Sequence, residues 1–326
     1  MSKQPARHDT AALTAQLDDS DLDALVAIAT AYYRDGKSKV EIAADRGISR
    51  FQVARMLSDA ARLGIVEIQI HDPRSYSSSL GDAVADALGL RRAVVVQPPS
   101  DPAHLIDRLG QASMELLASL ATPHMTIGLS WSRTLDAAAR YLPSLAPCTV
   151  VQLVGALQLR GSQHLLQVLA RLDGTPGTHT WPLYTPLVVD ESSTAIDLRR
   201  QPEIAETLAH ADQLDLAMVA IGAWTQGEST VWAKVDENVR RAAGKAGAIA
   251  EISGRLLDRD GKPVHTDLDK RTIGVSVEQL VQTPEVIAVA RGASRADAVR
   301  AAVRSGIVTS LVIDSALAEA ILASES

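Results

Sequence analysis

Apolar side chains recur at helical spacing over residues 21–35 and stop at Gly36. Glycine is favoured just beyond the C-terminus of a helix, so Gly36 is the expected end of this segment. The pattern predicts one amphipathic helix. Its apolar face would be formed by Leu22, Leu25, Val26, Ile28, Ala29 and Tyr32.

Two helix-start signals follow, eleven residues apart. In each, a serine precedes a Glu or Gln by three residues: Ser38 with Glu41, and Ser49 with Gln52. Such a capping box supplies partners to amide groups that the first helical turn leaves unpaired. Gly47 lies between the two signals and predicts a tight turn. The spacing therefore predicts a helix, a turn and a second helix, the arrangement that many proteins use to read the major groove of DNA.

Two segments of different composition follow this helix-turn-helix unit. Residues 65–70 alternate apolar and polar side chains, which predicts a strand that would form a wing. Pro73 and three consecutive serines then indicate a linker. We expect four parts: a flexible arm at 1–18, a winged helix-turn-helix DNA-binding domain at 19–72, a linker at 73–79, and an effector and oligomerisation domain at 80–326.

From residue 80 onward, helical stretches alternate with short runs rich in Val, Ile and Leu. Continuous apolar strands separated by helices are typical of a parallel sheet covered on both faces, so the second domain is predicted to be α/β. The predicted strands are 93–96, 125–129, 149–154, 215–221, 248–252, 286–290 and 310–313.

Ligands of open parallel sheets bind outside the carboxyl ends of the strands, so the residues that follow each strand are candidates for binding. The loop 130–134 offers hydroxyl groups, an arginine and the amides of a following helix, a combination suited to phosphate. Glycines at strand ends allow a ligand to approach the backbone closely. The candidates in four such loops are Gly128, Ser130, Trp131, Ser132, Arg133, Thr134, Gly155, Gln158, Arg160, Gly222, Gly292 and Arg295.

The charge of the chain is unevenly distributed. The net charge of −7 argues against a nucleic-acid partner, because phosphate neutralisation needs a basic surface. Between residues 34 and 62, however, seven basic residues stand against four acidic ones. A basic island in the predicted helix-turn-helix fits local contact with DNA, whereas a solvated helical face or a helical interaction module would have a similar composition.

The second helix of this pair would present four residues on the side opposite Val53 and Met56. Arginine can bond bidentately to guanine, and Phe51 could touch a thymine methyl group or instead belong to the core. Serines and long polar side chains near helix N-termini suit phosphate contacts. We expect base contacts from Arg50, Phe51, Ala54 and Arg55, and phosphate contacts from Ser38, Lys39, Ser49 and Gln52.

Several classes of protein are not expected. Cys148 is the single cysteine, which excludes an intramolecular disulfide and a cysteine-cluster zinc site. Asp258 and Asp260 imitate the start of a calcium loop, but Asp267 stands where that loop needs a glutamate, so a turn between strands is predicted. No apolar run reaches the roughly 18 residues that span a bilayer, and no signal-peptide pattern is visible. We expect a cytoplasmic protein without a metal, a cofactor or a membrane partner.

Several motifs, in order along nearly the whole chain, resemble those of the SorC-type family of sugar-responsive bacterial regulators. They include the helix-turn-helix sequence, then GLSWSRTL, VQLVGAL, DLAMVAIG, GAIAEISGRLLDRDGKPV, IGVSVEQL and VIAVARGASRADAVRAAVRSGIVTSLVID. The resemblance implies an effector domain similar to glucosamine-6-phosphate deaminase and ribose-5-phosphate isomerase. It also implies a phosphorylated sugar as effector and assembly as a dimer or tetramer.

By the same resemblance, the loop 130–134 would hold a phosphate, with Thr134 and neighbouring amides as donors. Glu251 would accept hydrogen bonds from sugar hydroxyls, the alternative being an exposed carboxylate at a strand end. The chain departs from the family where Ser132 and Arg291 replace glycines and Arg295 replaces a lysine. Because arginine offers a planar fork where lysine offers a point charge, a different sugar phosphate is expected.

An enzyme is the rival interpretation, either a sugar-phosphate isomerase or a hydrolase that carries an accessory helix-turn-helix. The sequence GLSWS partly matches the G-x-S-x-G nucleophile elbow, but a serine replaces the second glycine and no histidine is placed as in a triad. We therefore expect a non-enzymatic regulator of a carbohydrate-related operon that binds a two-fold symmetric operator. The sequence leaves open the sugar, the target operon, repression or activation, the effect of the effector on DNA binding, and dimer or tetramer.

Overall fold

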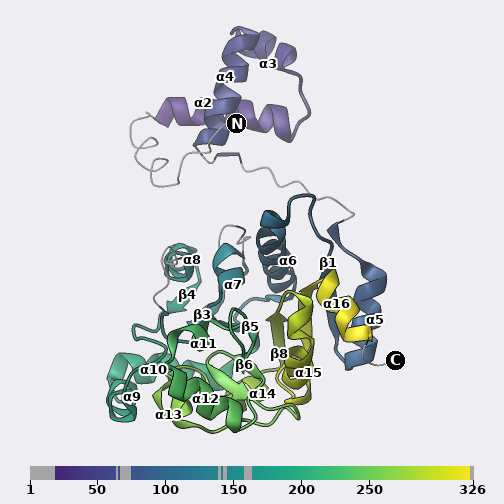
Figure 1. Ribbon diagram of the computed structural model, residues 1–326. Coiled ribbons are helices and arrows are strands. Elements are labelled where there is room, and N and C mark those ends of the chain that lie inside the picture. Colours follow the sequence, from purple (N-terminus) through teal and green to yellow (C-terminus); the bar gives the residue numbers. More distant parts are fainter. Residues whose placement is uncertain are drawn as a thin grey trace. The chain divides into compact units, whose positions relative to one another are not determined.

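The computed structural model describes residues 19–63, 65–66, 75–138, 141, 145–157 and 164–323 (Figure 1). The chain forms two compact units, Met1–Asp72 and Pro73–Ser326. The expected arm at 1–18, most of the expected wing strand and the start of the expected linker lie outside the described residues. Each unit is considered by itself below.

The first unit contains the three predicted helices α2 (Asp19–Tyr33), α3 (Lys39–Arg46) and α4 (Arg50–Arg62). Ser38 and Glu41 form the predicted capping box, in which the Ser38 hydroxyl accepts from the Glu41 amide and the Glu41 carboxylate accepts from the Ser38 amide. The Ser49 hydroxyl accepts from the Gln52 amide at 3.2 Å. Gly47 turns the chain with a φ of 65°.

The inner faces of these helices form a small core of their own. Its buried members are Ile28 from α2, Ile42 from α3, and Val53 and Leu57 from α4. This is the face that the spacing of apolar residues predicts. The opposite face of α4 is left to solvent, and the side chains there are available for a partner.

The second unit is built on a parallel sheet, which confirms the predicted α/β class. Along the sheet the order is β1-β9-β8-β5-β2-β3-β4, and each neighbouring pair in this order is parallel. The strands are β1 (Arg92–Val96), β2 (Thr126–Leu129), β3 (Thr149–Gln152), β4 (His179–Trp181), β5 (Leu216–Ala223), β8 (Glu285–Val289) and β9 (Ser310–Asp314).

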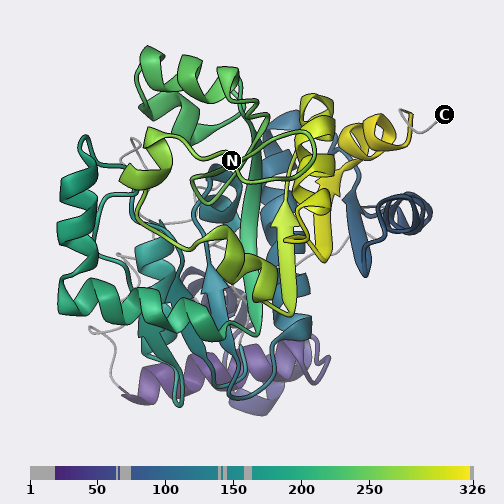
Figure 2. The ribbon, with the colours of Figure 1, turned by 90° about the horizontal axis from the view of Figure 1, so that it is seen from below.

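Helices cover both faces of this sheet. On one face, residues such as Leu109 and Leu169 are buried against Ile127 and Met218 of the sheet by α6 (Leu105–Leu120), α7 (Arg133–Ala138) and α8 (His164–Asp173). On the other face, residues such as Val299 and Leu317 are buried against alternate strand positions by α5 (Ser78–Leu88), α12 (Glu237–Lys245), α15 (Ala296–Arg304) and α16 (Ser315–Ala323). Figure 2 shows the C-terminal helices, in yellow, at one edge of the unit and the teal helices α9 (Ser192–Arg199) and α10 (Pro202–Ala209) at the opposite edge.

The helical segments of this unit vary from three to sixteen residues. They are α5 (Ser78–Leu88), η2 (Pro102–His104), α6 (Leu105–Leu120), α7 (Arg133–Ala138), α8 (His164–Asp173), α9 (Ser192–Arg199), α10 (Pro202–Ala209), η4 (His210–Gln213), α11 (Thr230–Lys234), α12 (Glu237–Lys245), α13 (Asp267–Arg271), α14 (Val277–Gln282), η5 (Ala293–Arg295), α15 (Ala296–Arg304) and α16 (Ser315–Ala323).

The prediction that residues 248–252 form a strand of the parallel sheet is wrong about the strand's direction. The run 248–252 contains β6 (Ala250–Ile252), which pairs antiparallel with β5 and continues into β7 (Arg255–Leu257) as a hairpin. Ser253 and Gly254, the two residues between the strands, both have positive φ values of 53° and 80°. A two-residue turn of this kind matches the twist of paired antiparallel strands. The turn therefore reverses the chain immediately after β6.

The expected linker at 73–79 also needs correction where the structure describes it. Tyr76 forms a bridge with Val96 at the edge of β1, and α5 begins at Ser78. The Ser77 hydroxyl accepts from the Leu80 amide and caps this helix. Residues 75–79 thus belong to the larger unit, because serine signals a helix start as well as a linker.

Candidate functional site

The order of the strands creates a crevice between β2 and β5. From β2 the chain proceeds outward through β3 and β4, whereas from β5 it proceeds outward in the other direction through β8 and β9. The connections that follow β2 and β5 leave on opposite sides of the sheet, which is where open α/β sheets bind ligands. A cavity lies at this point, and the space between its lining residues, together with the open solvent at its mouth, amounts to about 630 Å³.

This cavity brings together eight residues that the sequence analysis singled out from four separate segments. They come from the end of β2, the end of β5, the hairpin strand β6 and the end of β8. The eight are Trp131, Ser132, Arg133, Thr134, Gly222, Glu251, Arg291 and Arg295.

The loop after β2 enters the short helix α7. The Ser132 hydroxyl accepts from the Leu135 amide at 3.0 Å and so caps the first turn. The Ser130 side chain is buried beneath the loop, and its hydroxyl accepts from the Ser253 hydroxyl at 3.1 Å. The loop is therefore fixed at both ends, with Trp131 and Thr134 at the cavity wall.

Glu251 is a buried carboxylate, with 7 % of its surface exposed, so the alternative of an exposed strand-end group is wrong. One carboxylate oxygen accepts from the Gly254 amide at 2.6 Å, and the other accepts from the Ser229 hydroxyl at 3.0 Å. Burial raises the pKa of Glu251, and these two hydrogen bonds oppose the shift. The carboxyl group lies at the cavity wall, where it can accept further hydrogen bonds.

The turn after β8 is held by a residue of the neighbouring strand. The Gly292 amide lies 3.1 Å from both carboxylate oxygens of Asp314, at the end of β9. Asp314 also accepts from the Leu317 amide in the first turn of α16. Gly292 has a φ of 83°, which a residue with a side chain rarely adopts. The turn directs the Arg295 side chain into the cavity wall.

The Arg295 side chain is 8 % exposed and makes several contacts in the cavity wall. Its Nη1 atom lies 2.7 Å from Glu228 Oε2 and donates to the Arg291 carbonyl, while Nη2 donates to the Glu228 carbonyl at 3.0 Å. Burial is the largest influence on the guanidinium and lowers its pKa. Arg133 reaches the same loop and donates to the Gly227 carbonyl at 3.2 Å.

Among the described candidates, Gly128, Ser130, Gly155 and Gly292 do not line the cavity; Ser130 and Gly292 hold the neighbouring loops as described above. Gly128 lies within β2, where a Cβ would come within 2.7 Å of the Leu153 side chain. Gly155 packs against the backbone of Thr185 and Pro186, at 2.5 to 2.6 Å from an added Cβ. These two glycines therefore allow close packing. Gln158 and Arg160 lie outside the described residues.

Five polar residues at or beside the cavity were missed by the sequence analysis: Glu228, Ser229, Thr230, Ser253 and Asp314. Glu228 and Ser229 lie in a polar loop whose composition indicates only a turn. Asp314 follows the apolar run 310–313, so the rule that selects the ends of strands could have found it. Ser253 was missed because the sequence analysis did not predict the hairpin of β6 and β7, whose turn contains this residue.

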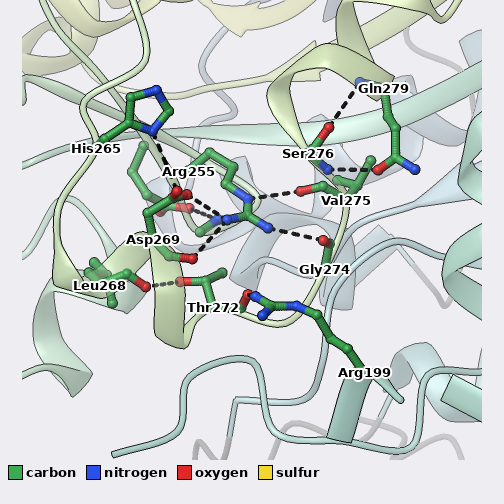
Figure 3. A network of polar contacts seen from close by, with 12 residues as sticks. Arg199, Arg255, His265, Leu268, Asp269, Thr272, Gly274, Val275, Ser276 and Gln279 are labelled. Carbon is green, nitrogen blue, oxygen red and sulfur yellow. Dashed lines mark hydrogen bonds and ion pairs between the residues drawn. The ribbon is translucent and has the colours of Figure 1, made fainter. Parts of the chain in front are cut away.

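A polar network around Arg255 braces the segment 269–275 (Figure 3). The buried Arg255 side chain donates to the carbonyls of Val275, Gly274 and Asp269, and its Nη1 lies 2.6 Å from the Asp269 carboxylate. The braced segment pairs with Val154 and Val188 through bridges at Gly274 and Thr272. Val154 itself lines the cavity, so Arg255 supports the wall from behind.

In the first unit, the residues predicted to contact DNA are on the outside of the helices. Phe51 is 73 % exposed, so its alternative assignment to the core is wrong. The Arg50 guanidinium lies 5.0 Å from the centre of the Phe51 ring. Ala54 is half-buried, and the remaining predicted residues are exposed: Ser38, Lys39, Ser49, Arg50, Gln52 and Arg55.

The described residues show neither a metal-binding cluster nor a membrane-spanning helix. In the part of the chain that the structure describes, no group of three or more His, Cys, Asp or Glu side chains is arranged to hold a metal ion. Among the described helices, none has both the length and the apolar character needed to cross a membrane.

Comparisons with known proteins agree with one another. Residues 72–323 match the family model Sugar-bind, described as "Putative sugar-binding domain". The chain is 27 % identical over 304 residues to the uncharacterized transcriptional regulator YjhU of Escherichia coli K12, covering 90 % of this chain and 92 % of that one. It is 26 % identical over 300 residues to the transcriptional regulator LsrR of Klebsiella pneumoniae, covering 91 % of each.

The fold also matches a solved structure over most of the chain. The full-length sorbitol operon regulator SorC of Klebsiella pneumoniae superposes with a TM-score of 0.67 at 23 % identity, covering 93 % of this chain and all of that one.

Proposed function

This chain belongs to the sugar-binding domain family of SorC-type transcriptional regulators, and from that premise we propose that it controls a carbohydrate-related operon in response to a phosphorylated sugar or polyol. The observation that carries this proposal is the cavity at the switch point between β2 and β5, which is lined by Arg133 after β2 and by Arg291 and Arg295 after β8. The proposed role is binding and regulation without catalysis.

The charges at this wall favour an anionic ligand. Arg133 and Arg291 come from the loops after β2 and β8, and Arg295 lies between them at the start of α15. Guanidinium groups bind phosphate oxygens through paired donors, and the amides of the loop 130–134 supply further donors. We assign Thr134 and these amides to the phosphate, as the family resemblance implies.

The remainder of the cavity suits a polyhydroxylated molecule. Glu251 offers carboxylate oxygens at the wall, and Trp131 offers an apolar surface beside it. Each Glu251 oxygen already accepts one hydrogen bond within the chain, and a carboxylate oxygen can accept a second one from a ligand hydroxyl group. Sugar hydroxyls fit this requirement, and the phosphate would lie toward the arginines.

The first unit supplies the surface proposed to bind DNA. Arg50 and Arg55 project from α4 with the exposed Phe51 between them, and Ser38 and Ser49 stand at the N-termini of α3 and α4. We assign α4 to the major groove and the serines, Lys39 and Gln52 to phosphates. A wing at 65–70 and a two-fold operator bound by a homo-oligomer are parts of the same proposal.

The proposed mechanism is a shift between two populations of the oligomer. A ligand that binds one arrangement more tightly moves the equilibrium toward it by the difference in affinity. Through the segment that joins the two units, this would change the spacing of the paired α4 helices relative to the operator half-sites. The likeness of the larger unit to sugar-phosphate isomerases is a further proposal, which rests on the family resemblance.

The test is a titration of the full-length protein against fluorescent operator DNA, selected from random fragments. We expect at least one phosphorylated sugar or polyol to change the dissociation constant by about tenfold, the usual scale of allosteric coupling. The unphosphorylated counterpart should have no effect. Thr134→Val should bind the DNA normally and lose the response. DNA affinity unchanged by every phosphorylated compound would contradict the proposal.

A further inference from the structure

We propose that Glu228 is an internal competitor for Arg295, so that the cavity accepts only ligands whose anionic group outcompetes a carboxylate. This inference rests on the proposed function, because it concerns the same cavity. It assigns to Glu228 the selection of the effector by charge.

Arg295, the most deeply buried of the three arginines at the cavity wall, is already paired with a carboxylate. The Glu228 carboxylate lies 2.7 Å from Arg295 Nη1, and the two side chains are 28 % and 8 % exposed. The other prong of the guanidinium donates to the Glu228 carbonyl at 3.0 Å. Glu228 thus contacts both prongs of the fork, through an ion pair with its carboxylate and a hydrogen bond to its carbonyl, while Nη1 also donates to the Arg291 carbonyl.

Arg133 binds the carbonyl group of Gly227, the residue before Glu228. Its Nη2 donates to the Gly227 carbonyl at 3.2 Å, directly before Glu228. Two cations from separate strand ends therefore contact two consecutive residues of the loop between β5 and α11. This loop therefore offers the two guanidinium groups the kind of oxygen atoms that a bound anion would offer.

The Glu228 carboxylate can move while its backbone stays in place. Ser229 is anchored because its hydroxyl donates to Glu251 at 3.0 Å and accepts from the Trp232 amide at 3.1 Å. The Glu228 amide donates to the Thr225 carbonyl at 3.2 Å. The Glu228 side chain is 28 % exposed, so rotation about its own bonds can release the carboxylate from Arg295 while α11 and Glu251 stay in place.

The charges decide which ligands can replace Glu228. A carboxylate carries one negative charge, whereas a phosphate monoester carries about 1.5 to 2 at neutral pH and three strong acceptor oxygens. A neutral sugar offers no charge to a buried guanidinium, and displacing Glu228 would leave that guanidinium unpaired at a large cost. An internal competitor also reduces the apparent affinity for every anion by the fraction of molecules in which Arg295 is free.

The test compares two charge-matched variants of the full-length protein by isothermal titration calorimetry. Glu228→Gln removes the competing charge and keeps the shape of the side chain. Glu237→Gln removes one charge from an exposed pair with Arg241 on α12 and serves as the control. The probes are ribose 5-phosphate, glucose 6-phosphate, fructose 6-phosphate, their unphosphorylated sugars, inorganic phosphate and the monoanion gluconate.

We expect Glu228→Gln to bind phosphorylated probes at least about tenfold more tightly than the native chain and to acquire measurable binding of gluconate. Glu237→Gln should match the native chain. Equal or weaker binding by Glu228→Gln, with the native chain still binding a sugar phosphate, would overturn this inference and leave the proposed function standing. Binding of no phosphorylated probe by any form would contradict the proposed function, and the inference with it.

A second variant covers the case in which Glu228→Gln does not fold. Glu228→Asp keeps the charge but withdraws it by one methylene from Arg295, so a smaller gain in affinity for the phosphorylated probes is expected. Circular dichroism and thermal melting establish that each variant is folded. An affinity equal to that of the native chain in folded Glu228→Asp would overturn the inference.

Discussion

Gly222 and Glu251 are direct partners in the antiparallel pairing of β5 and β6, and a Cβ added at Gly222 would lie 3.2 Å from a carboxylate oxygen of Glu251. Because glycine has no side chain, the buried Glu251 carboxylate fits beside Gly222. This pairing connects the end of a parallel strand to the hairpin, so that a residue from each faces the same cavity.

Gly222→Ala should weaken both folding and ligand binding. The added methyl group would lie 3.1 Å from the Glu228 carbonyl and the Ser229 Cβ, as well as near Glu251. Overpacking of this kind costs about 1 to 3 kcal/mol. Gly244→Ala is the control, since this residue lies in α12 with no atom within 4 Å of an added Cβ, and the change should be neutral or stabilising. Equal melting temperatures of Gly222→Ala and the native chain would contradict the packing described.

Glu251→Gln should change how stability depends on pH. Burial raises the pKa of Glu251 above its ordinary value of 4.5, so the folded chain retains a proton that the unfolded chain has lost. The free energy of unfolding of the native chain therefore falls as the pH rises from the ordinary carboxyl value through the raised one. Glutamine lacks this loss, and the variant should gain stability relative to the native chain over that range.

Urea denaturation at a series of pH values measures this difference. Gly244→Ala changes no titratable group, and its difference from the native chain should stay constant across the series. A difference between Glu251→Gln and the native chain that does not vary with pH would show that Glu251 is not protonated on folding.

Arg255→Met should destabilise the larger unit. The substitution leaves the carbonyls of Val275 and Gly274 without this donor and removes the arginine partner of Asp269, whose carboxylate keeps its contact with His265 (Figure 3). Because Asp269 is 35 % exposed and water can reach it, we expect a loss of about 2 to 4 kcal/mol in the free energy of unfolding. The exposed pair of Arg241 with Glu237 offers a control, and Arg241→Met should cost less than about 1 kcal/mol. Similar losses in both variants would rule out the bracing role.

Arg50→Ala should reduce sequence preference in DNA binding by about 1 to 3 kcal/mol, the scale of a bidentate contact with guanine. Arg62→Ala, which removes an equal charge from the last turn of α4, should weaken specific and non-specific DNA alike or have no effect. Gel-shift titrations with operator and scrambled DNA measure both quantities. An unchanged ratio of the two affinities in Arg50→Ala would exclude Arg50 from base recognition.

Much of the fold follows from local patterns that are visible in the sequence. Runs such as 286–290 are apolar throughout because helices cover both faces of the sheet, and this identifies buried parallel strands. The capping box at Ser38 and the glycine at 47 define their helix ends by chemistry within three or four residues. The confirmed helices and strands are those whose signals are local in this way.

The elements that escaped prediction depend on distant partners. β4 has three residues, two of them polar, and is a strand because β3 lies beside it. The direction of β6 depends on the turn at Ser253 and Gly254, since an apolar run carries no information about the direction of its neighbour. The pairing of Glu228 with Arg295 joins residues 67 positions apart, and no local pattern indicates it.

The central claim is that the cavity between β2 and β5 binds a phosphorylated sugar. A thermal-shift screen of the full-length protein against paired phosphorylated and unphosphorylated sugars tests it most directly, because a ligand that binds only the folded state raises the melting temperature. We predict a concentration-dependent rise with at least one sugar phosphate, none with its unphosphorylated partner, and loss of the rise in Thr134→Val. No rise with any phosphorylated sugar, or an equal rise with its unphosphorylated partner, would contradict the claim.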